Sequence, residues 1–217
     1  MFKSKKTIIR VGVLSAVALV AFGAPAAFAA SSYNVTAGSA PADTIIRYTA
    51  TSTQVTFKDT TGGTTLNCAS ASATGTVTVG TNLSWTGIGT VDGTVWNTCS
   101  GPFGFTQTVT GSGIWGLNAT GDTVGGVTPV RISGVNLHFA GGCNFDYTGS
   151  IDGTYTNGPS NGTLILPGTS SGLTISNVSG SSCFFGWSNG DLASVKATYQ
   201  VVANAGAYNP IQITSNP

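Results

Sequence analysis

The sequence contains a single histidine, His138, which is the natural candidate for a general base because its ordinary pKa lies near neutrality. The segment Gly168-Thr-Ser-Ser-Gly172 also matches the G-x-S-x-G pattern, in which a strand turns into a helix and exposes the serine oxygen. Strand-like sequence lies on both sides of this segment, so we interpret it as a hairpin turn and assign Ser170 no catalytic role. Alternation in Leu137-His138-Phe139 turns His138 outward, which favours an ordinary solvent-facing residue.

The acidic residues are seven aspartates, and the sequence has no glutamate. Glycoside hydrolysis needs two carboxyl groups held close together across a cleft, and no pair of aspartates stands out in the sequence. A metal site would need further ligands, but there is no second histidine and no D-x-[DN]-x-[DN]-G calcium loop. We therefore predict no catalytic residues, no metal and no cofactor.

Aromatic side chains gather near the cysteines and in glycine-rich segments. Phe103, Trp115 and Trp187 are the candidates for exposed stacking surfaces, because aromatic faces beside Asn, Asp and Thr suit sugars or planar apolar ligands. The alternative is that these rings pack against the cysteines as part of the core.

Four cysteines, Cys68, Cys99, Cys143 and Cys183, are typical of a disulfide framework in an oxidising compartment. Zinc would require paired ligands such as C-x-x-C, whereas the cysteines here are separated by 31, 44 and 40 residues. Three pairings are open to four cysteines. We expect Cys68–Cys99 and Cys143–Cys183, because each bridge closes a short loop within one half of the chain.

The first 29 residues have the features of an export signal. A basic segment ending at Arg10 precedes the apolar run Val11–Phe22, and Ala27 and Ala29 form an A-x-A cleavage pattern. Twelve apolar residues in a helix span roughly 18 Å, which is too short for a hydrocarbon core of about 30 Å. We predict a helical signal peptide over 1–29, a single domain over 30–217 without a membrane span, and an extracellular or cell-surface location.

Composition excludes several classes of partner. Removal of the signal leaves Arg47, Lys58, Arg131 and Lys196 against the seven aspartates. So few cations exclude a basic surface for nucleic acid or anionic lipid, where each neutralised phosphate needs its own Lys or Arg. Abundant Gly, Thr and Val favour strands and tight turns.

Alternation of apolar and polar residues recurs along the chain. In Val195–Val201, the residues Val195, Ala197, Tyr199 and Val201 are expected to face the core, with Lys196 outward. The phase slips at Ser133-Gly134, which indicates a β-bulge. The Asp-Gly pairs at 92–93 and 152–153 suit either a hairpin turn or a continuous strand. The pattern predicts an all-β fold, an antiparallel β-sandwich or flattened β-barrel of about ten strands.

The export signal, the spaced cysteines and the tail from Val195 to Pro217 together carry a resemblance. The chain resembles the small secreted Gly/Thr-rich β-proteins that actinobacteria encode in several copies, generally without an assigned function. This resemblance implies a bacterial exported protein and transfers no functional residues.

Three functions remain open from the sequence. The first is a non-enzymatic secreted or wall-associated protein, a structural or surface-interaction module whose partner would be cell-wall or extracellular carbohydrate. The second is a carrier that holds a sugar or apolar ligand in an aromatic-lined cleft, and the third is a hydrolase with an Asp-based site. An enclosed aromatic-lined cavity would favour the second function, and two close carboxyls in a groove would favour the third.

Overall fold

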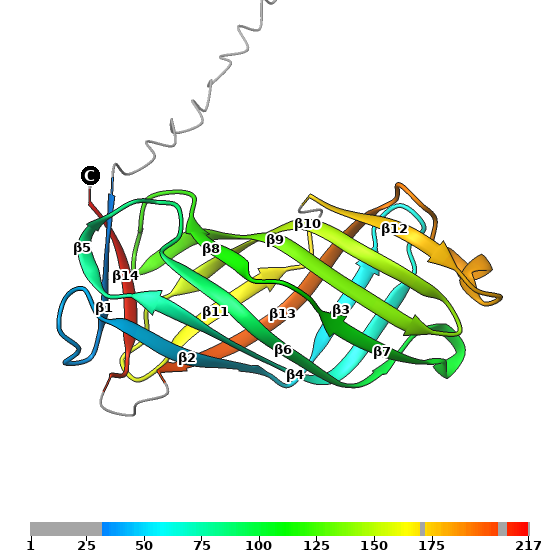
Figure 1. Ribbon diagram of the computed structural model, residues 1–217, viewed down its shortest axis with the longest axis horizontal. Helices are drawn as coiled ribbons and strands as arrows, with labels where there is room; N and C mark the ends of the chain where they lie inside the picture. The colour runs from blue at the N-terminus through cyan, green and yellow to red at the C-terminus, as the bar shows by residue number, and fades with distance from the viewer. Residues whose placement is uncertain (1–31, 170–171, 204–207, 217) are drawn as a thin grey trace, which may run out of the picture.

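The computed structural model describes residues 32–169, 172–203 and 208–216. The predicted signal peptide over 1–29 lies outside these residues. The described chain is built from strands and two short 3-10 turns, which confirms the all-β prediction (Figure 1). The strands are β1 (Ser32–Ala37), β2 (Ile45–Ser52), β3 (Val55–Asp59), β4 (Thr65–Thr78), β5 (Gly80–Leu83), β6 (Gly89–Ser100), β7 (Thr106–Gly111), β8 (Trp115–Ala119), β9 (Val127–Gly141), β10 (Asn144–Thr156), β11 (Gly162–Pro167), β12 (Leu173–Ser179), β13 (Leu192–Ala203) and β14 (Ile211–Asn216). The two turns are η1 (Pro102–Gly104) and η2 (Cys183–Phe185).

Eleven strands form one antiparallel barrel in which sequence neighbours are also neighbours in space. The order is β2 with β3, then β4, β6, β7 with β8, β9, β10, β11 with β12, and β13. β13 pairs with both β2 and β3, which closes the barrel at eight strand positions. Of the two predicted architectures the structure therefore has the barrel. Closure removes most of the lengthwise sheet edge of these strands, the feature that makes open sheets prone to aggregation.

Three of the eight positions hold two strands that run in the same direction, one after the other. β11 and β12 both pair antiparallel with β10, and both also pair with β13. The prediction that Gly168–Gly172 forms a hairpin turn is therefore wrong. The flanking strands β11 and β12 share one interrupted strand position, and Ser170 lies outside the described residues. Alternation cannot distinguish these cases, since both place strands on either side of a glycine-rich segment.

The predicted strand phases are confirmed. Val195, Ala197, Tyr199 and Val201 are buried on the inner face of β13, and Lys196 is exposed on the outer face. The bulge in β9 is confirmed as well: Val135 pairs with Gly149 and Ser133 with Ser150, so Gly134 is left over. Its φ of 72° is a left-handed conformation that suits glycine.

Both Asp-Gly pairs lie within continuous strands, β6 and β10, rather than in hairpin turns. Each aspartate binds an arginine on the outer surface of the barrel, with N–O distances of 3.0 Å for Arg47–Asp92 and 2.6 Å for Arg131–Asp152.

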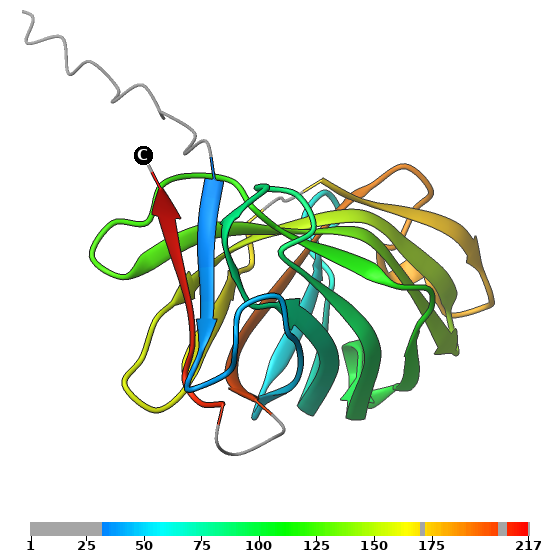
Figure 2. The same ribbon diagram turned by 60° about the vertical axis from the view of Figure 1, so that its left-hand side comes forward.

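A separate three-stranded sheet, in the order β14-β1-β5, lies across one end of the barrel (Figure 2). Four of its side chains, Tyr33, Val35, Ile211 and Ile213, are at most 1% exposed and belong to the common core. The Tyr155 hydroxyl donates to the carbonyl of Ile211 at 2.8 Å and anchors this sheet to the barrel wall. We call this end of the molecule the sheet-capped end.

Both disulfides lie toward the opposite end, which we call the disulfide end. Cys68 pairs with Cys99 between β4 and β6, and Cys143 pairs with Cys183, as predicted. The second bridge fastens the turn η2 to the connection between β9 and β10. No cysteine is left free, and disulfides of this kind are typical of an oxidising environment. Within the described residues, no helix is long and apolar enough to cross a membrane.

Candidate functional site

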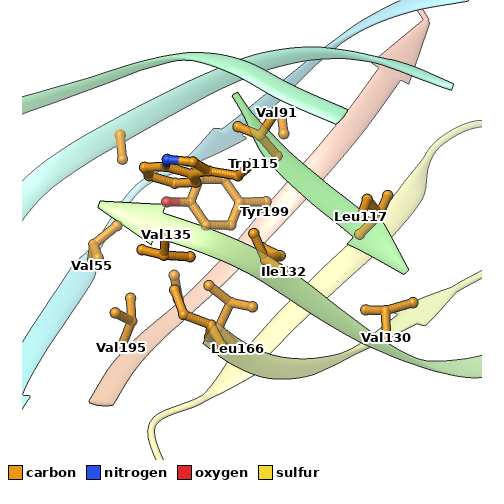
Figure 3. Close-up of a cluster of buried hydrophobic side chains, with 14 of the residues drawn as sticks. Val55, Val91, Trp115, Leu117, Val130, Ile132, Val135, Leu166, Val195 and Tyr199 are labelled. Atoms are coloured by element: carbon orange, nitrogen blue, oxygen red, sulfur yellow. The ribbon is translucent and has the colours of Figure 1, made fainter. Parts of the chain in front are cut away.

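The barrel interior contains a cavity of ≈ 50 Å³. Aliphatic side chains from seven of the eight strand positions line most of it, and Thr94 and five aromatic residues line the remainder: Tyr48, Phe57, Trp96, Trp115 and Tyr199. Figure 3 shows Trp115 and Tyr199 pointing into the interior together with Ile132 and Leu166. We call this space the lumen cavity.

The aromatic rings of the lumen cavity are held in place by their polar tips. The Trp115 indole N–H donates to the carbonyl of Ser112 at 3.0 Å. The Trp96 indole donates to the Tyr199 hydroxyl, and the Tyr48 hydroxyl donates to the carbonyl of Thr90 at 2.8 Å. The polar atoms of these four residues are thereby engaged with the wall, so the cavity is faced by ring surfaces and methyl groups.

Burial keeps the lumen tyrosines neutral. It raises the pKa of Tyr199 to about 12, although the hydrogen bond from Trp96 acts in the opposite direction. Burial also raises the pKa of Tyr48, and the negative charge of Asp92 adds to this shift. Both phenols therefore stay protonated at physiological pH, and the cavity carries no charge that would attract an ionic ligand.

A second, smaller cavity of ≈ 30 Å³ lies toward the sheet-capped end. It shares Tyr48, Val91, Ile132 and Leu164 with the lumen cavity. Ile211 and Ile213 of β14 also line it, so the small sheet forms its floor. These four shared side chains separate the two cavities. A rotamer change in one of these side chains would therefore join part of the smaller cavity to the lumen cavity.

The prediction of exposed stacking surfaces is wrong for two of its three residues. Trp115 and Trp187 are each 5% exposed. Trp115 folds over Gly111, where a side chain would come within 3.0 Å of the indole, and thus turns into the lumen. Trp187 stacks on Phe145 with ring centroids 4.9 Å apart and closes the disulfide end from within. For Trp187, the expectation that rings pack as core near the cysteines describes what is observed.

Phe103 differs, since 81% of it is exposed. It lies in η1 with a φ of 57°, a left-handed conformation that is rare outside glycine. Phe184 in η2 is 76% exposed and belongs to the same end of the barrel. The disulfide end therefore presents aromatic side chains to solvent, although the residues that sequence analysis grouped together do not form one surface.

His138 lies on the outer face of β9 and is half exposed, as predicted. Its Nδ1 is 2.6 Å from Oδ1 of Asp146, and the Asn177 amide donates to the other carboxylate oxygen. Although burial raises the pKa of Asp146, the hydrogen bonds from Asn177 and His138 outweigh it and hold that pKa below its usual value. The carboxylate orients the imidazole, but the pair lies outside the barrel, away from the lumen cavity.

Asp59 and Asp191 form a carboxyl pair that sequence analysis missed because 132 positions separate them. Asp59 is fully buried, and its Oδ1 accepts the backbone N–H groups of Thr61 and Gly62 at 2.8 and 2.7 Å. Its Oδ2 has no hydrogen-bond donor. Burial and the neighbouring Asp191 raise the pKa of Asp59 despite these two bonds, so Asp59 retains a proton more readily than a free carboxyl group. Among the described residues, no group of three or more His, Cys, Asp or Glu side chains is placed to hold a metal ion.

Sequence analysis also missed Tyr48, Trp96 and Tyr199 as lumen residues. Alternation correctly placed Tyr199 on the inner face, but it could not show that three strands bring these rings around one space. The comparisons with known proteins add no candidate: the chain matches no protein-family model, no curated protein and no solved structure.

Proposed function

We propose that the protein is an exported carrier that binds a small, compact apolar molecule in the lumen of its barrel. The lumen cavity carries this proposal, because it is the enclosed aromatic-lined space that separates a carrier from a purely structural protein. The two disulfides support export, since such bridges persist in oxidising compartments outside the cytosol.

The dimensions of the cavity limit the ligand. Most pockets for drug-sized ligands measure about 300–1,000 Å³, and a cavity of about 150 Å³ holds benzene. The ≈ 50 Å³ of the lumen cavity and the adjoining ≈ 30 Å³ together fall short of this volume, so the lining side chains must also repack to accept even one ring. This favours a single ring or a short branched hydrocarbon over a fatty acid or a polycyclic ligand.

The chemistry of the lining selects against polar ligands. A water molecule or a sugar needs several hydrogen-bonding partners, whereas the polar groups of Trp96, Trp115 and Tyr48 are already hydrogen-bonded within the barrel wall. A sugar inserted here would leave its hydroxyl groups unsatisfied, at a cost of about 1–3 kcal/mol for each. The ring faces instead offer stacking and dispersion contacts to an apolar ligand.

Toluene is a suitable probe, and thermal unfolding is a suitable readout, because a ligand that binds only the folded state stabilises it. We expect toluene near its solubility limit to raise the Tm of the wild type. Ala73 lines the cavity and is only partly buried, so Ala73→Leu should fill the space and abolish the shift. Ser72→Val, on the outer face of the same strand, is the matched control and should keep it. Equal toluene shifts in the wild type and Ala73→Leu would refute the lumen as the binding site.

The exposed rings of the disulfide end favour a second candidate, a surface-interaction module for extracellular carbohydrate. Phe103 and Phe184 extend into solvent from two loops, and the loop of Phe184 is fixed by the Cys143–Cys183 bridge. A pull-down on insoluble cell-wall polysaccharide tests this function. Binding that is lost in Phe103→Ser/Phe184→Ser and kept in Ala73→Leu would support the surface module, whereas equal binding by both variants would exclude these rings from it.

A further inference from the structure

The barrel wall has one long seam that is not held by a strand ladder. β6 pairs with β7 only at Cys99 and Ser100, and with β8 only from Gly89 to Val91. Over residues 92–98, β6 has no strand partner on this side within the described part of the chain. On its other side the same stretch is paired with β4 almost throughout.

The facing strand is fully paired on its own far side. β7 pairs with β9 from Gln107 to Gly111, and β8 resumes that pairing at Gly116. The gap is therefore local to the β6 side rather than a frayed region of the sheet. Thr98, at one end of the gap, has a left-handed φ of 51°, and the β4–β6 register shifts near the other end, between Thr74 and Gly75.

Side chains close the seam in place of backbone hydrogen bonds. The Thr94 hydroxyl lies where a side chain at Gly111 would point, and the Trp115 indole lies next to both. Thr94, Trp96 and Trp115 also line the lumen cavity. Thr94 and Trp96 are only half buried, so the lining of the cavity reaches the surface at this seam.

The two ends of the barrel offer poorer routes. The small sheet covers one end with Ile211 and Ile213, and its hydrogen bonds to the wall would have to break. Stacked rings of Phe139, Phe145 and Trp187 fill the other. Parting β6 from β7 at residues 92–98 separates no paired residues of a strand ladder, whereas parting β4 from β6 or β7 from β9 would separate continuous ladders.

We propose that the lumen ligand enters and leaves through the seam between β6 and β7, with Thr94 and Trp96 as the side chains that move aside. This inference rests on the proposed function, because it assigns a route to the same cavity. Opening at the seam would let a ligand exchange while both ends of the barrel stay folded.

A cross-link across the seam tests the route. A Cβ atom at Gly111 would overlap the Thr94 hydroxyl, so the two positions are close enough for a disulfide after Thr94→Cys/Gly111→Cys once the strands shift slightly apart. The control is Thr94→Ser/Gly111→Ser, which has nearly the same side chains without the bond. We expect the oxidised cross-linked protein to exchange toluene at least tenfold more slowly than the control by NMR exchange spectroscopy, with a Kd within about twofold.

The outcomes separate the two proposals. Equal exchange rates in the cross-linked protein and the control would overturn the seam and leave the carrier function intact, whereas absence of toluene binding by the wild type would overturn the carrier function itself. Hydrogen exchange on the wild type without ligand gives a second test. The alternate amides over residues 93–97 that point toward β7 should exchange at least tenfold faster than the amides of the paired β9–β10 ladder. Equal protection would show that β6 and β7 are hydrogen-bonded along the seam and would overturn the route.

Discussion

The two ends of the barrel are closed by different means. At the sheet-capped end, a separate sheet buries Ile211 and Ile213 against the barrel and is anchored by hydrogen bonds from Tyr155 and Asn157. At the disulfide end, which lies opposite the small sheet (Figure 1), stacked rings fill the opening, Cys68–Cys99 joins β4 to β6, and Cys143–Cys183 ties η2 to the β9–β10 connection. The comparison teaches that one end depends on burial of chain-terminal strands, while the other is cross-linked covalently.

The largest effect is expected at the sheet-capped end. Ile211→Ala/Ile213→Ala removes two buried side chains from β14, and each such truncation typically costs 2–5 kcal/mol, so we expect a loss of more than about 4 kcal/mol. Denaturant titration measures the free energy of unfolding. A loss below about 1 kcal/mol would show that the small sheet is an appendage rather than part of the core.

The corresponding change at the disulfide end should be somewhat smaller. Cys143→Ser/Cys183→Ser removes a bridge that closes a loop of 40 residues, and chain entropy alone gives a loss of about 4 kcal/mol, within a usual range of 2–5. The same titration measures it, and proteolysis should cut the loop around η2 first. If proteolysis began instead at the sheet-capped end, the comparison of the two ends would be reversed.

The next prediction concerns the pH dependence of stability that Asp59 causes at the disulfide end. Because the pKa of folded Asp59 is raised above its unfolded value, its contribution to stability is fully present below about pH 4 and is lost as pH rises through the folded pKa. Asp59→Asn keeps the oxygen that accepts from Thr61 and Gly62 and should remove this decline. We expect the variant to be at least as stable as the wild type at pH 7.

The measurement is unfolding free energy between pH 4 and 8. Asp146 provides the internal contrast, because its pKa is lowered: its contribution is present above about pH 4 and is lost as pH falls through the folded value. An Asp59→Asn protein that lost stability at pH 7, with the same pH slope as the wild type, would contradict the raised pKa of Asp59.

The smallest effect is expected at His138. The side chain is exposed on the outer face of β9, where its bond to Asp146 is a surface pair worth about 0–1 kcal/mol. We therefore expect His138→Gln to leave the unfolding free energy and toluene binding within error of the wild type at pH 5–8. A hydrolytic activity abolished by this substitution in a folded protein would disprove the non-enzymatic role.

Much of the wall, but little of the interior, could be predicted from the sequence. Alternation placed Tyr199 inward and the bulge at Gly134, and cysteine spacing favoured the observed bridges. These features depend on local pattern or loop length. Which strands surround one cavity depends on closure between β13 and β2, a contact that no local pattern encodes.

The interrupted strand positions explain the remaining errors. Trp115 resembled an exposed ring in a glycine-rich loop, but Gly111 leaves room for its indole to fold inward. The pair Asp59–Asp191 was invisible because it forms only when the loop after β12 reaches the turn after β3. Asp191 thus lies far from Asp59 in the sequence, whereas Gly111 and Trp115 belong to the two strands of one interrupted position.

The position of a bound probe tests the central claim most directly. At saturating toluene, intermolecular NOEs from the probe to the methyl groups of Val91, Ile132 and Leu166 would place the ligand between the two closed ends, in the lumen cavity. We predict these NOEs, together with none to the ring of Phe103. NOEs confined to Phe103 and Phe184, or none to any lumen methyl group, would contradict the account.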